Sequence, residues 1–176
     1  MVKKRGINYL DFEVDKLTRS IENIVTGDSF ETEIGNLLRN DLVQISKKKG
    51  WLFDWKYEFD QNDREVYKLT IRQNPNIIQG VISLRVESDH IYSPLIEVAP
   101  FNKGKGKIYL GIPGNLVAYA CRLSFQKGYE GFVSFHAKTK LIDHYFKTLG
   151  ATHAGGQLMF IHTDAALQLI EKYFKS

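Results

Sequence analysis

The pattern of apolar and polar positions first marks four strand-like segments, at residues 51–59, 64–73, 77–86 and 91–98. In the first of them, aromatic residues recur at every second position: Trp51, Phe53, Trp55, Tyr57 and Phe59. A period of two is typical of strands, and only short turns separate the four segments. The pattern therefore predicts an antiparallel meander of four strands.

A proline lies inside the fourth of these strands. Pro94 has no backbone N–H to donate, so residues 91–98 cannot pair regularly on both sides. We therefore expect a bulge at this position, or a neighbouring strand that splays away.

In the second half of the chain, apolar residues recur at helical spacing in residues 113–126 and 139–150. Pro113 suits a first helical turn, and Gly128 and Gly150 follow the two helices as stop signals.

Strands are expected at residues 131–136 and 155–162, and a last helix at residues 165–174, capped by Thr163 or Asp164. Strand 131–136 follows a crossover helix. It should therefore run parallel to the strand at residues 91–98.

The first 50 residues give weaker signals. Residues 1–16 are polar, and we expect them to be peripheral. The turn at residues 26–29 predicts a hairpin within residues 17–34, although Val14, Leu17, Ile21, Ile24 and Val25 also fit helical spacing. A short helix is expected at residues 42–49, capped by Asn40-Asp41 and stopped by Gly50.

These elements predict a single α+β domain over residues 1–176. Its mixed central sheet would be antiparallel in its first part and continue as a β-α-β-α-β unit, with helices on both faces. Residues 51–161 would form the core, and residues 17–50 would form variable N-terminal elements.

Composition restricts the class of protein. The 176 residues are 43% hydrophobic and 25% charged, which is ordinary for a globular domain. No apolar run reaches the roughly 20 residues that span a bilayer, and the N-terminus lacks the apolar stretch of a signal peptide. We therefore expect a cytoplasmic protein that does not enter membranes.

The single cysteine, Cys121, excludes an internal disulfide and a multi-cysteine metal site. It lies within a helical pattern, which favours a small core residue over a catalytic thiol. The histidines are scattered without the spacing of a metal site, so no metal is predicted.

The formal net charge is +4, and the lysines form two clusters. Residues 47–49 suit the C-terminus of a helix, where cations are favourable. Lys103, Lys105 and Lys107 lie instead in a loop that precedes a helix. A general nucleic-acid-binding protein is typically more basic than this chain, so nucleic acid is not the favoured partner.

The most informative stretch is residues 91–128, where a strand, a basic glycine-rich loop and a helix follow one another. The N-terminus of a helix presents free N–H groups and the positive end of the helix dipole. This junction is therefore a candidate anion site. The alternative is a plain helix start beside a charged surface loop.

Two motifs within this order resemble the GNAT N-acetyltransferase family. One is LIEVAPFNKGKGKIYLGIPGNLVAYAC, at residues 95–121, which is similar to the family's strand, loop and helix that bind acetyl-CoA. The other is HYFKTLGA, at residues 144–151, which is similar to the family's helix end. The resemblance covers roughly residues 51–161. It implies acetyl-CoA as cofactor and an amine, on a small molecule or a protein, as acceptor.

The resemblance also implies where acetyl-CoA would bind, between the fourth and fifth strands. We place the pyrophosphate turn at residues 111–114, because a helix that began at Lys107 would contain Gly111, Pro113 and Gly114. Ile108 and Pro113 depart from the family pattern at its basic or amide position and its second glycine. The residues implied for cofactor binding are Val98, Lys103, Lys105, Lys107, Gly111, Ile112, Gly114, Asn115 and Leu116.

Three residues are candidates for catalysis by analogy with the family. Glu97 would be a general base beside the thioester, and His136 ends the fifth strand close to the same gap. The family's tyrosine acid falls on Phe146 here. Either the adjacent Tyr145 takes this role, or water does, or the protein lacks a side-chain acid. For each of the three, a purely structural role is the alternative.

The leading hypothesis is therefore an acetyl-CoA-dependent N-acetyltransferase with an unidentified amine acceptor. An alternative keeps the fold as a catalytically degenerate module that binds CoA, acyl-CoA or another protein. A basic nucleic-acid-binding protein is the less favoured third hypothesis. The oligomeric state is left open, with a homodimer among the options.

Overall fold

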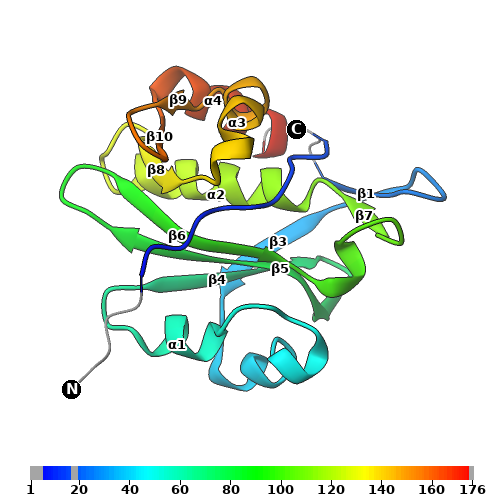
Figure 1. The fold of residues 1–176 in the computed structure, drawn as a ribbon. Helices are drawn as coiled ribbons and strands as arrows, with labels where there is room; N and C mark the ends of the chain where they lie inside the picture. The colour runs from blue at the N-terminus through cyan, green and yellow to red at the C-terminus, as the bar shows by residue number, and fades with distance from the viewer. Residues whose placement is uncertain (1–5, 17–19, 175–176) are drawn as a thin grey trace.

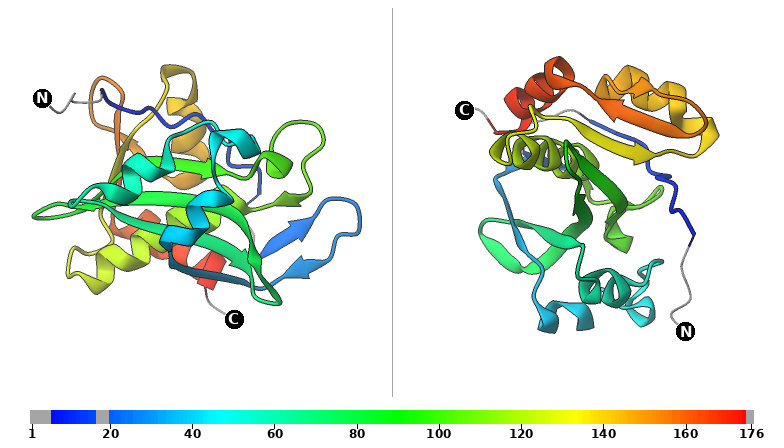
Figure 2. Two further views of the ribbon diagram at one scale, coloured as in Figure 1. Left: turned by 90° about the horizontal axis from the view of Figure 1, so that it is seen from below. Right: turned by 90° about the vertical axis from the view of Figure 1, so that its left-hand side faces the viewer.

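The structure is a computed structural model that describes residues 6–16 and 20–174. A mixed sheet lies at its centre with helices on both faces (Figures 1 and 2). This arrangement confirms the predicted fold class. The sheet separates a larger hydrophobic core, which includes α2, α3 and α4, from a smaller one around Trp51 and Trp55.

The strands of the described residues are β1 Ile21–Asn23, β2 Ser29–Phe30, β3 Thr32–Asn36, β4 Glu65–Ile71, β5 Asn74–Val86, β6 Ile91–Val98, β7 Tyr109–Leu110, β8 Val133–His136, β9 Thr152–His153 and β10 Leu158–Ile161.

The helices of the described residues are α1 Trp55–Asp60, α2 Ile112–Gln126, α3 Ile142–Leu149 and α4 Thr163–Phe174, with 3-10 turns at Arg39–Val43, Lys47–Lys49, Pro100–Asn102 and Thr139–Leu141. None of these helices has the length and apolar character required to cross a membrane.

The main sheet has the strand order β3-β4-β5-β6-β8-β10-β9. Its strand pairs are antiparallel except for β6 and β8, which run parallel as predicted. The hairpin predicted around residues 26–29 is present as β1 and β2, and β7 extends it into a small second sheet. Leu17, at the start of the predicted hairpin segment, lies outside the described residues.

The strand predicted at residues 51–59 is wrong, because this segment contains helix α1. The Asp54 carboxylate accepts a hydrogen bond from the Tyr57 N–H at 3.0 Å and so caps the helix. Aromatic residues at every second position also recur at every fourth, so the same pattern suits one face of a helix. The first strand of the meander is therefore β3, which pairs with β4.

Two smaller predictions also need correction. The short helix expected at residues 42–49 is instead a pair of 3-10 turns, although Gly50 ends the second in the left-handed conformation with φ of 94°. Helix α4 already includes Thr163 and Asp164, so these two residues form its first turn instead of preceding it.

Pro94 marks an irregularity in β6, as the sequence predicted. Leu95 pairs with Ser83, but the next pair joins Tyr92 to Arg85, so the register shifts across Ser93 and Pro94. On its other side, β6 pairs with β8 only at Ile91 and Tyr92. Beyond this point, the two strands separate.

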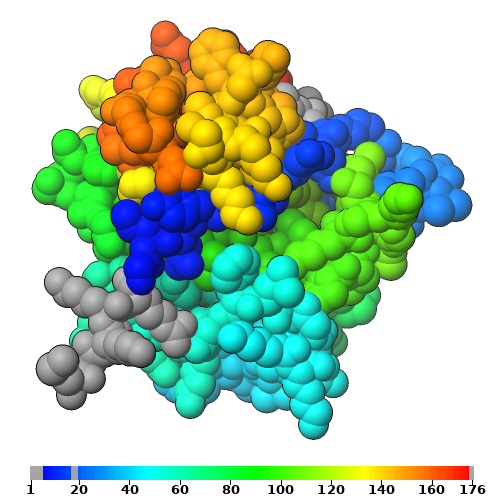
Figure 3. All heavy atoms as spheres, viewed as in Figure 1, coloured from blue at the N-terminus to red at the C-terminus, as the bar shows by residue number. Residues whose placement is uncertain are grey.

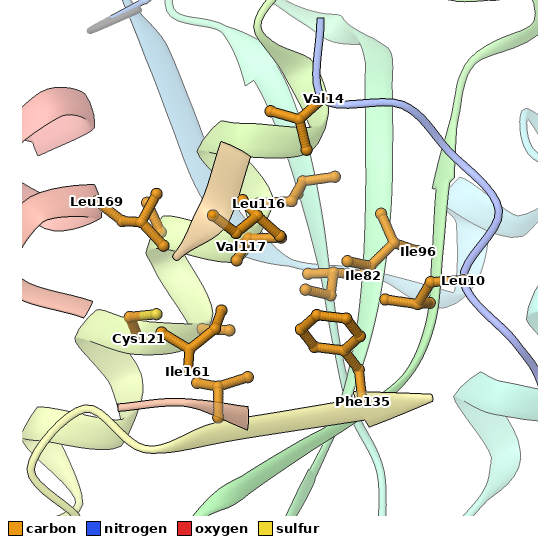
Figure 4. Packing of buried hydrophobic residues seen from close by; sticks show 14 of the residues in the cluster. Leu10, Val14, Ile82, Ile96, Leu116, Val117, Cys121, Phe135, Ile161 and Leu169 are labelled. Carbon is orange, nitrogen blue, oxygen red and sulfur yellow. The ribbon is translucent and has the colours of Figure 1, made fainter. Parts of the chain in front are cut away.

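The described part of the N-terminal segment, residues 6–16, is not peripheral, which corrects the expectation for residues 1–16. We call it the N-terminal strap. Leu10 is 2% exposed and Val14 is 7% exposed, and both belong to the larger core. Figure 4 shows Leu10 between Ile96 of β6 and Phe135 of β8.

Backbone hydrogen bonds join the strap to the end of β8. The Leu10 N–H donates to the His136 carbonyl at 2.7 Å, and the Lys138 N–H donates to the Leu10 carbonyl at 3.1 Å. Leu10 thereby forms a parallel bridge with Ala137. The strap takes the position beside β8 that β6 leaves when the two strands separate.

We predict that Leu10→Ala lowers the free energy of unfolding by about 2–4 kcal/mol, because it leaves a cavity in the core. Ile7→Ala is the matched control on the same strap; Ile7 is 55% exposed, and its truncation should change stability by less than about 0.5 kcal/mol. Urea unfolding of both variants measures the difference. Equal stabilities would show that the strap does not belong to the folded core.

Candidate active site

The gap between β6 and β8 exposes one edge of β6. The Ala99 N–H donates to the Gln79 carbonyl at 2.9 Å, and Val98 lies opposite Gly80 of β5. Hydrogen-bonded positions alternate along an antiparallel pair, so the backbone groups of Val98 and Ile96 face away from β5. They face the gap, where an extended ligand could pair with them.

A cavity of about 560 Å³ occupies this gap. Residues 95–98 of β6 and the loop at residues 102–107 form one side of it, and the strap forms the other. Leu52 and Phe53 complete the wall near α1. Figure 3 shows the strap, in blue, lying between the part of the molecule that contains α3 and the part that contains α1.

The loop that carries the three lysines is fixed at its base by a buried amide. Asn102 donates from Nδ2 to Oε1 of Gln79 at 3.0 Å and accepts from the Tyr109 N–H at 3.2 Å. Lys103, Lys105 and Lys107 therefore project from a closed loop, and all three line the cavity. A cationic rim of this kind suits an anionic ligand.

Two of these lysines are held by carboxylates. Lys103 Nζ lies 2.8 Å from Glu97 Oε2, and Lys107 Nζ lies 3.0 Å from Asp15 Oδ2. Lys105 is exposed. Glu97 of β6 and Asp15 of the strap thus partly neutralise the positive charge of the loop.

Helix α2 begins shortly after this loop in the chain. Gly111 precedes the helix with φ of 95°, a left-handed conformation that glycine adopts without strain. Its N–H donates to Asp15 Oδ1 at 3.1 Å, and its carbonyl accepts from Asn115 Nδ2 at 2.7 Å. The strap carboxylate therefore lies at the positive end of the helix dipole.

The predicted cofactor residues divide into two groups. Val98, Lys103, Lys105, Lys107 and Ile112 line the cavity. Gly111, Gly114, Asn115 and Leu116 do not, and the last three are buried in α2.

Gly114 is needed for packing. A Cβ atom at this position would lie 1.8 Å from the Tyr173 hydroxyl oxygen of α4. That hydroxyl donates to the Lys16 carbonyl of the strap at 3.0 Å. A side chain at Gly114 would therefore disturb α4 and the strap, so its effect on ligand binding would not report on phosphate contacts alone.

Glu97 is a buried carboxylate surrounded by donors. Its Oε2 accepts from the Leu52 N–H at 2.7 Å and from Lys103 Nζ at 2.8 Å. Its Oε1 accepts from Trp55 Nε1 at 2.8 Å and from the Phe53 N–H at 3.3 Å. Because these four bonds occupy both carboxylate oxygens, the geometry supports a positioning role more than a general base.

Tyr145 is also engaged within the fold. Its hydroxyl donates to the Phe12 carbonyl of the strap at 2.6 Å, and burial raises its pKa well above the ordinary value. The neighbouring Phe146 is 60% exposed. In this conformation, Tyr145 holds the strap and has no direct path for a proton to the cavity.

His136 lies at the end of β8, on the other side of the strap from Glu97. Its Nδ1 is 2.7 Å from the Tyr92 hydroxyl, and the ring of Tyr9 contacts it edge-on. Burial lowers the pKa of His136, so the neutral imidazole is favoured near pH 7. Both His136 and Tyr92 line a second cavity of about 460 Å³.

Sequence reasoning missed the strap and Asp15 as parts of this site. A signal was present, because Leu10, Phe12 and Val14 alternate with Asp11, Glu13 and Asp15 as in a half-buried strand. The shortness of the pattern and its place at the start of the chain concealed it.

The single cysteine does not line the cavity. Cys121 is buried in α2, and burial raises the pKa of its thiol far above the ordinary value. Within residues 6–16 and 20–174, no cluster of three or more histidine, cysteine or carboxylate side chains could hold a metal ion.

Comparison by sequence finds no matching family model and no matching curated protein. Comparison by structure finds solved proteins with a similar fold. Mutant forms of the spermidine/spermine N-acetyltransferase SpeG from Vibrio cholerae align with a TM-score of 0.57 at 15% identity, over 78% of this chain and 96% of theirs. The Vibrio cholerae spermidine N-acetyltransferase in complex with CoA and spermine aligns with a TM-score of 0.51 at 15% identity, over 77% and 98%.

The chain has the GNAT N-acetyltransferase fold. The two strands between which the resemblance placed acetyl-CoA are β6 and β8. The loop and helix that follow β6 are residues 99–111 and α2. In this chain, the strap lies in the gap beside the end of β8.

We predict that Glu97→Gln lowers the free energy of unfolding by about 2–4 kcal/mol, because an amide N–H₂ would face a buried donor and Lys103 would lose its partner. Glu33→Gln, on an exposed side chain of β3, is the control and should change stability by less than about 0.5 kcal/mol. Chemical denaturation compares them. A Glu97→Gln protein as stable as the wild type would contradict the structural role assigned to these four bonds.

Proposed function

We propose that this protein is an acetyl-CoA-dependent N-acetyltransferase that acts on an amine. The observation that carries the proposal is the gap between β6 and β8. It combines backbone groups of Val98 that face the cavity with a basic loop at the start of α2. An extended chain that ends in phosphates matches both features.

The structural neighbours support the choice of substrates. The Vibrio cholerae proteins are spermidine or spermine N-acetyltransferases, and one was crystallised with CoA and spermine. We extend CoA and an amine acceptor from those proteins to this chain. A cytoplasmic location stays a prediction from the sequence, as does the option of a homodimer.

The residues on the β6 side of the cavity suit CoA in charge and in backbone pairing. Lys103, Lys105 and Lys107 would hold the phosphates, and the backbone groups of Ile96 and Val98 would pair with the amides of the pantetheine arm. Gly111 would supply its N–H to a phosphate oxygen once Asp15 releases it. Pro113 has no N–H to offer at this helix start.

The proposed reaction is a direct acyl transfer. The amine nitrogen forms a bond to the acetyl carbonyl carbon, and the carbon–sulfur bond of the thioester breaks. The amine gives up a proton to a base, and the thiolate that leaves takes up a proton from water. A backbone N–H at the edge of β6 is suited to stabilise the negative charge that develops on the carbonyl oxygen.

His136 is the best placed of the three catalytic candidates to act as the base. Both oxygens of Glu97 accept hydrogen bonds within the fold, and the Tyr145 hydroxyl donates to the strap. His136, whose Nδ1 contacts the Tyr92 hydroxyl, instead lines the second cavity. An amine in that cavity would approach the gap from the side opposite the lysine loop. The low pKa of His136 keeps it ready to accept a proton at neutral pH.

Titration calorimetry of the wild type with CoA should show saturable binding at one site. Lys105→Ala should weaken that binding about three- to tenfold, because it removes one cation from the phosphate site. The effect should shrink at high salt, since exposed charges are screened.

Lys47→Ala is the matched control, because Lys47 is an exposed lysine of a 3-10 turn outside the cavity. It should leave CoA affinity unchanged within about twofold. A Lys105→Ala protein that binds CoA as tightly as the Lys47→Ala protein would contradict the assigned phosphate site.

A panel of amines that includes spermidine and spermine should identify an acceptor. With this acceptor, kcat should fall at acidic pH, because a protonated base cannot accept a proton. Burial lowers the pKa of His136, so the fall should lie below about pH 6.5, the ordinary pKa of histidine. His136→Gln should lower kcat about 100-fold and abolish this acidic limb, with CoA affinity unchanged. A variant with the wild-type pH profile would exclude His136 as the base.

The alternative is a module of the same fold that binds CoA or acyl-CoA without turnover. The departures at Ile108, Pro113 and Phe146 favour it, as does the engagement of Glu97 and Tyr145. CoA binding without acetylation of any amine in the panel would select this alternative.

A further inference from the structure

The strap follows the path that the proposed cofactor requires. At one end, Asp15 contacts the Gly111 N–H and Lys107 through its two carboxylate oxygens. At the other, the backbone of Leu10 lies in the gap beside the end of β8. The strap thus places an anion at the start of α2 and an extended chain between the separated strands.

We infer that the N-terminal strap is an internal competitor of the cofactor. Asp15 takes the position of a phosphate, and the extended residues 10–14 narrow the gap meant for the pantetheine arm. Binding of CoA then requires the strap to move away from α2. This inference rests on the proposed function, because it assigns the cavity to CoA.

The polar contacts that hold the strap are few and discrete, beside the packing of Leu10 and Val14 in the core. The Val14 N–H donates to His144 Nε2 at 2.8 Å, and the Phe12 carbonyl accepts from the Tyr145 hydroxyl. Together with the bonds of Leu10 and Asp15, these are separate points of attachment and not a continuous strand ladder. They can open one after another, starting at the charged end.

The charges explain why a phosphate can displace Asp15. The Asp15 carboxylate carries one negative charge and meets one lysine and one N–H. A pyrophosphate brings more charge and more acceptor oxygens to the same donors, and it can also engage Lys105. The strap therefore raises the cofactor concentration needed for binding without abolishing binding.

The first test is the affinity of full-length variants for CoA, measured by calorimetry. Asp15→Asn keeps the shape of the side chain but removes its charge, so CoA should bind about three- to tenfold tighter. Glu33→Gln is the control, because it removes the same charge from an exposed position on β3, outside the cavity. It should change affinity by less than about twofold.

Hydrogen exchange of the wild type provides a second readout. Addition of CoA should speed amide exchange at residues 10–14 as the strap leaves, and slow exchange in the loop at residues 102–107. If the strap is instead a fixed wall of the cofactor site, CoA will slow exchange in both segments, and the inference fails.

A third test uses a disulfide between the two cysteines that Leu10→Cys and Ala137→Cys introduce. Leu10 and Ala137 are bridge partners, and paired strands lie about 4.7–4.9 Å apart, within the Cα spacing of disulfides. The oxidised protein should bind CoA at least about tenfold more weakly than the reduced protein. Each single cysteine variant, with folding checked by circular dichroism, controls for the substitutions.

The outcomes separate the two proposals. If CoA binds the wild type, the Asp15→Asn protein and the oxidised protein with equal affinity, the strap is not a competitor while the proposed function stands. If CoA binds none of them, including the folded Asp15→Asn and reduced proteins, the proposed function fails and the inference fails with it.

Discussion

The separation of β6 from β8 is the constraint on which the rest of the structure depends. Pro94 cannot donate to a ladder, the register of β6 shifts beside it, and the parallel pairing with β8 stops after Tyr92. An open strand edge in the middle of a sheet leaves backbone groups without bonds and side chains without neighbours. The strap, the lysine loop and the cavity between them all lie in the space that this separation creates.

Glu97 stabilises the wall of that space on the side of α1. One buried carboxylate fixes the backbone of Leu52 and Phe53, the indole of Trp55 and the ammonium of Lys103. Burial of the charge is acceptable because each oxygen has two donors. The same bonds explain why a residue that suits a general base by sequence position serves here to hold three segments together.

Much of the fold could be predicted from the sequence, because periodicity and stop signals are local. Strands β4, β5, β6, β8 and β10, helix α2 and the stop signals at Gly128 and Gly150 follow from such local signals. The strand predicted at residues 51–59 was wrong because residues that recur at every second position also recur at every fourth. The alternation therefore could not exclude helix α1. The site was harder, since the contacts of Asp15 with Gly111 and of Tyr145 with Phe12 join residues far apart in the chain.

The contact between Tyr173 and Lys16 has a consequence for how the molecule behaves as a whole. The Tyr173 hydroxyl of the last helix reaches past Gly114 to the Lys16 carbonyl of the strap, so α4 and the strap meet over the first turn of α2. A load, a fusion or a cut applied near α4 would therefore disturb the strap at Lys16 as well. The strap and α4 are therefore coupled, and loosening one of them weakens the anchoring of the other.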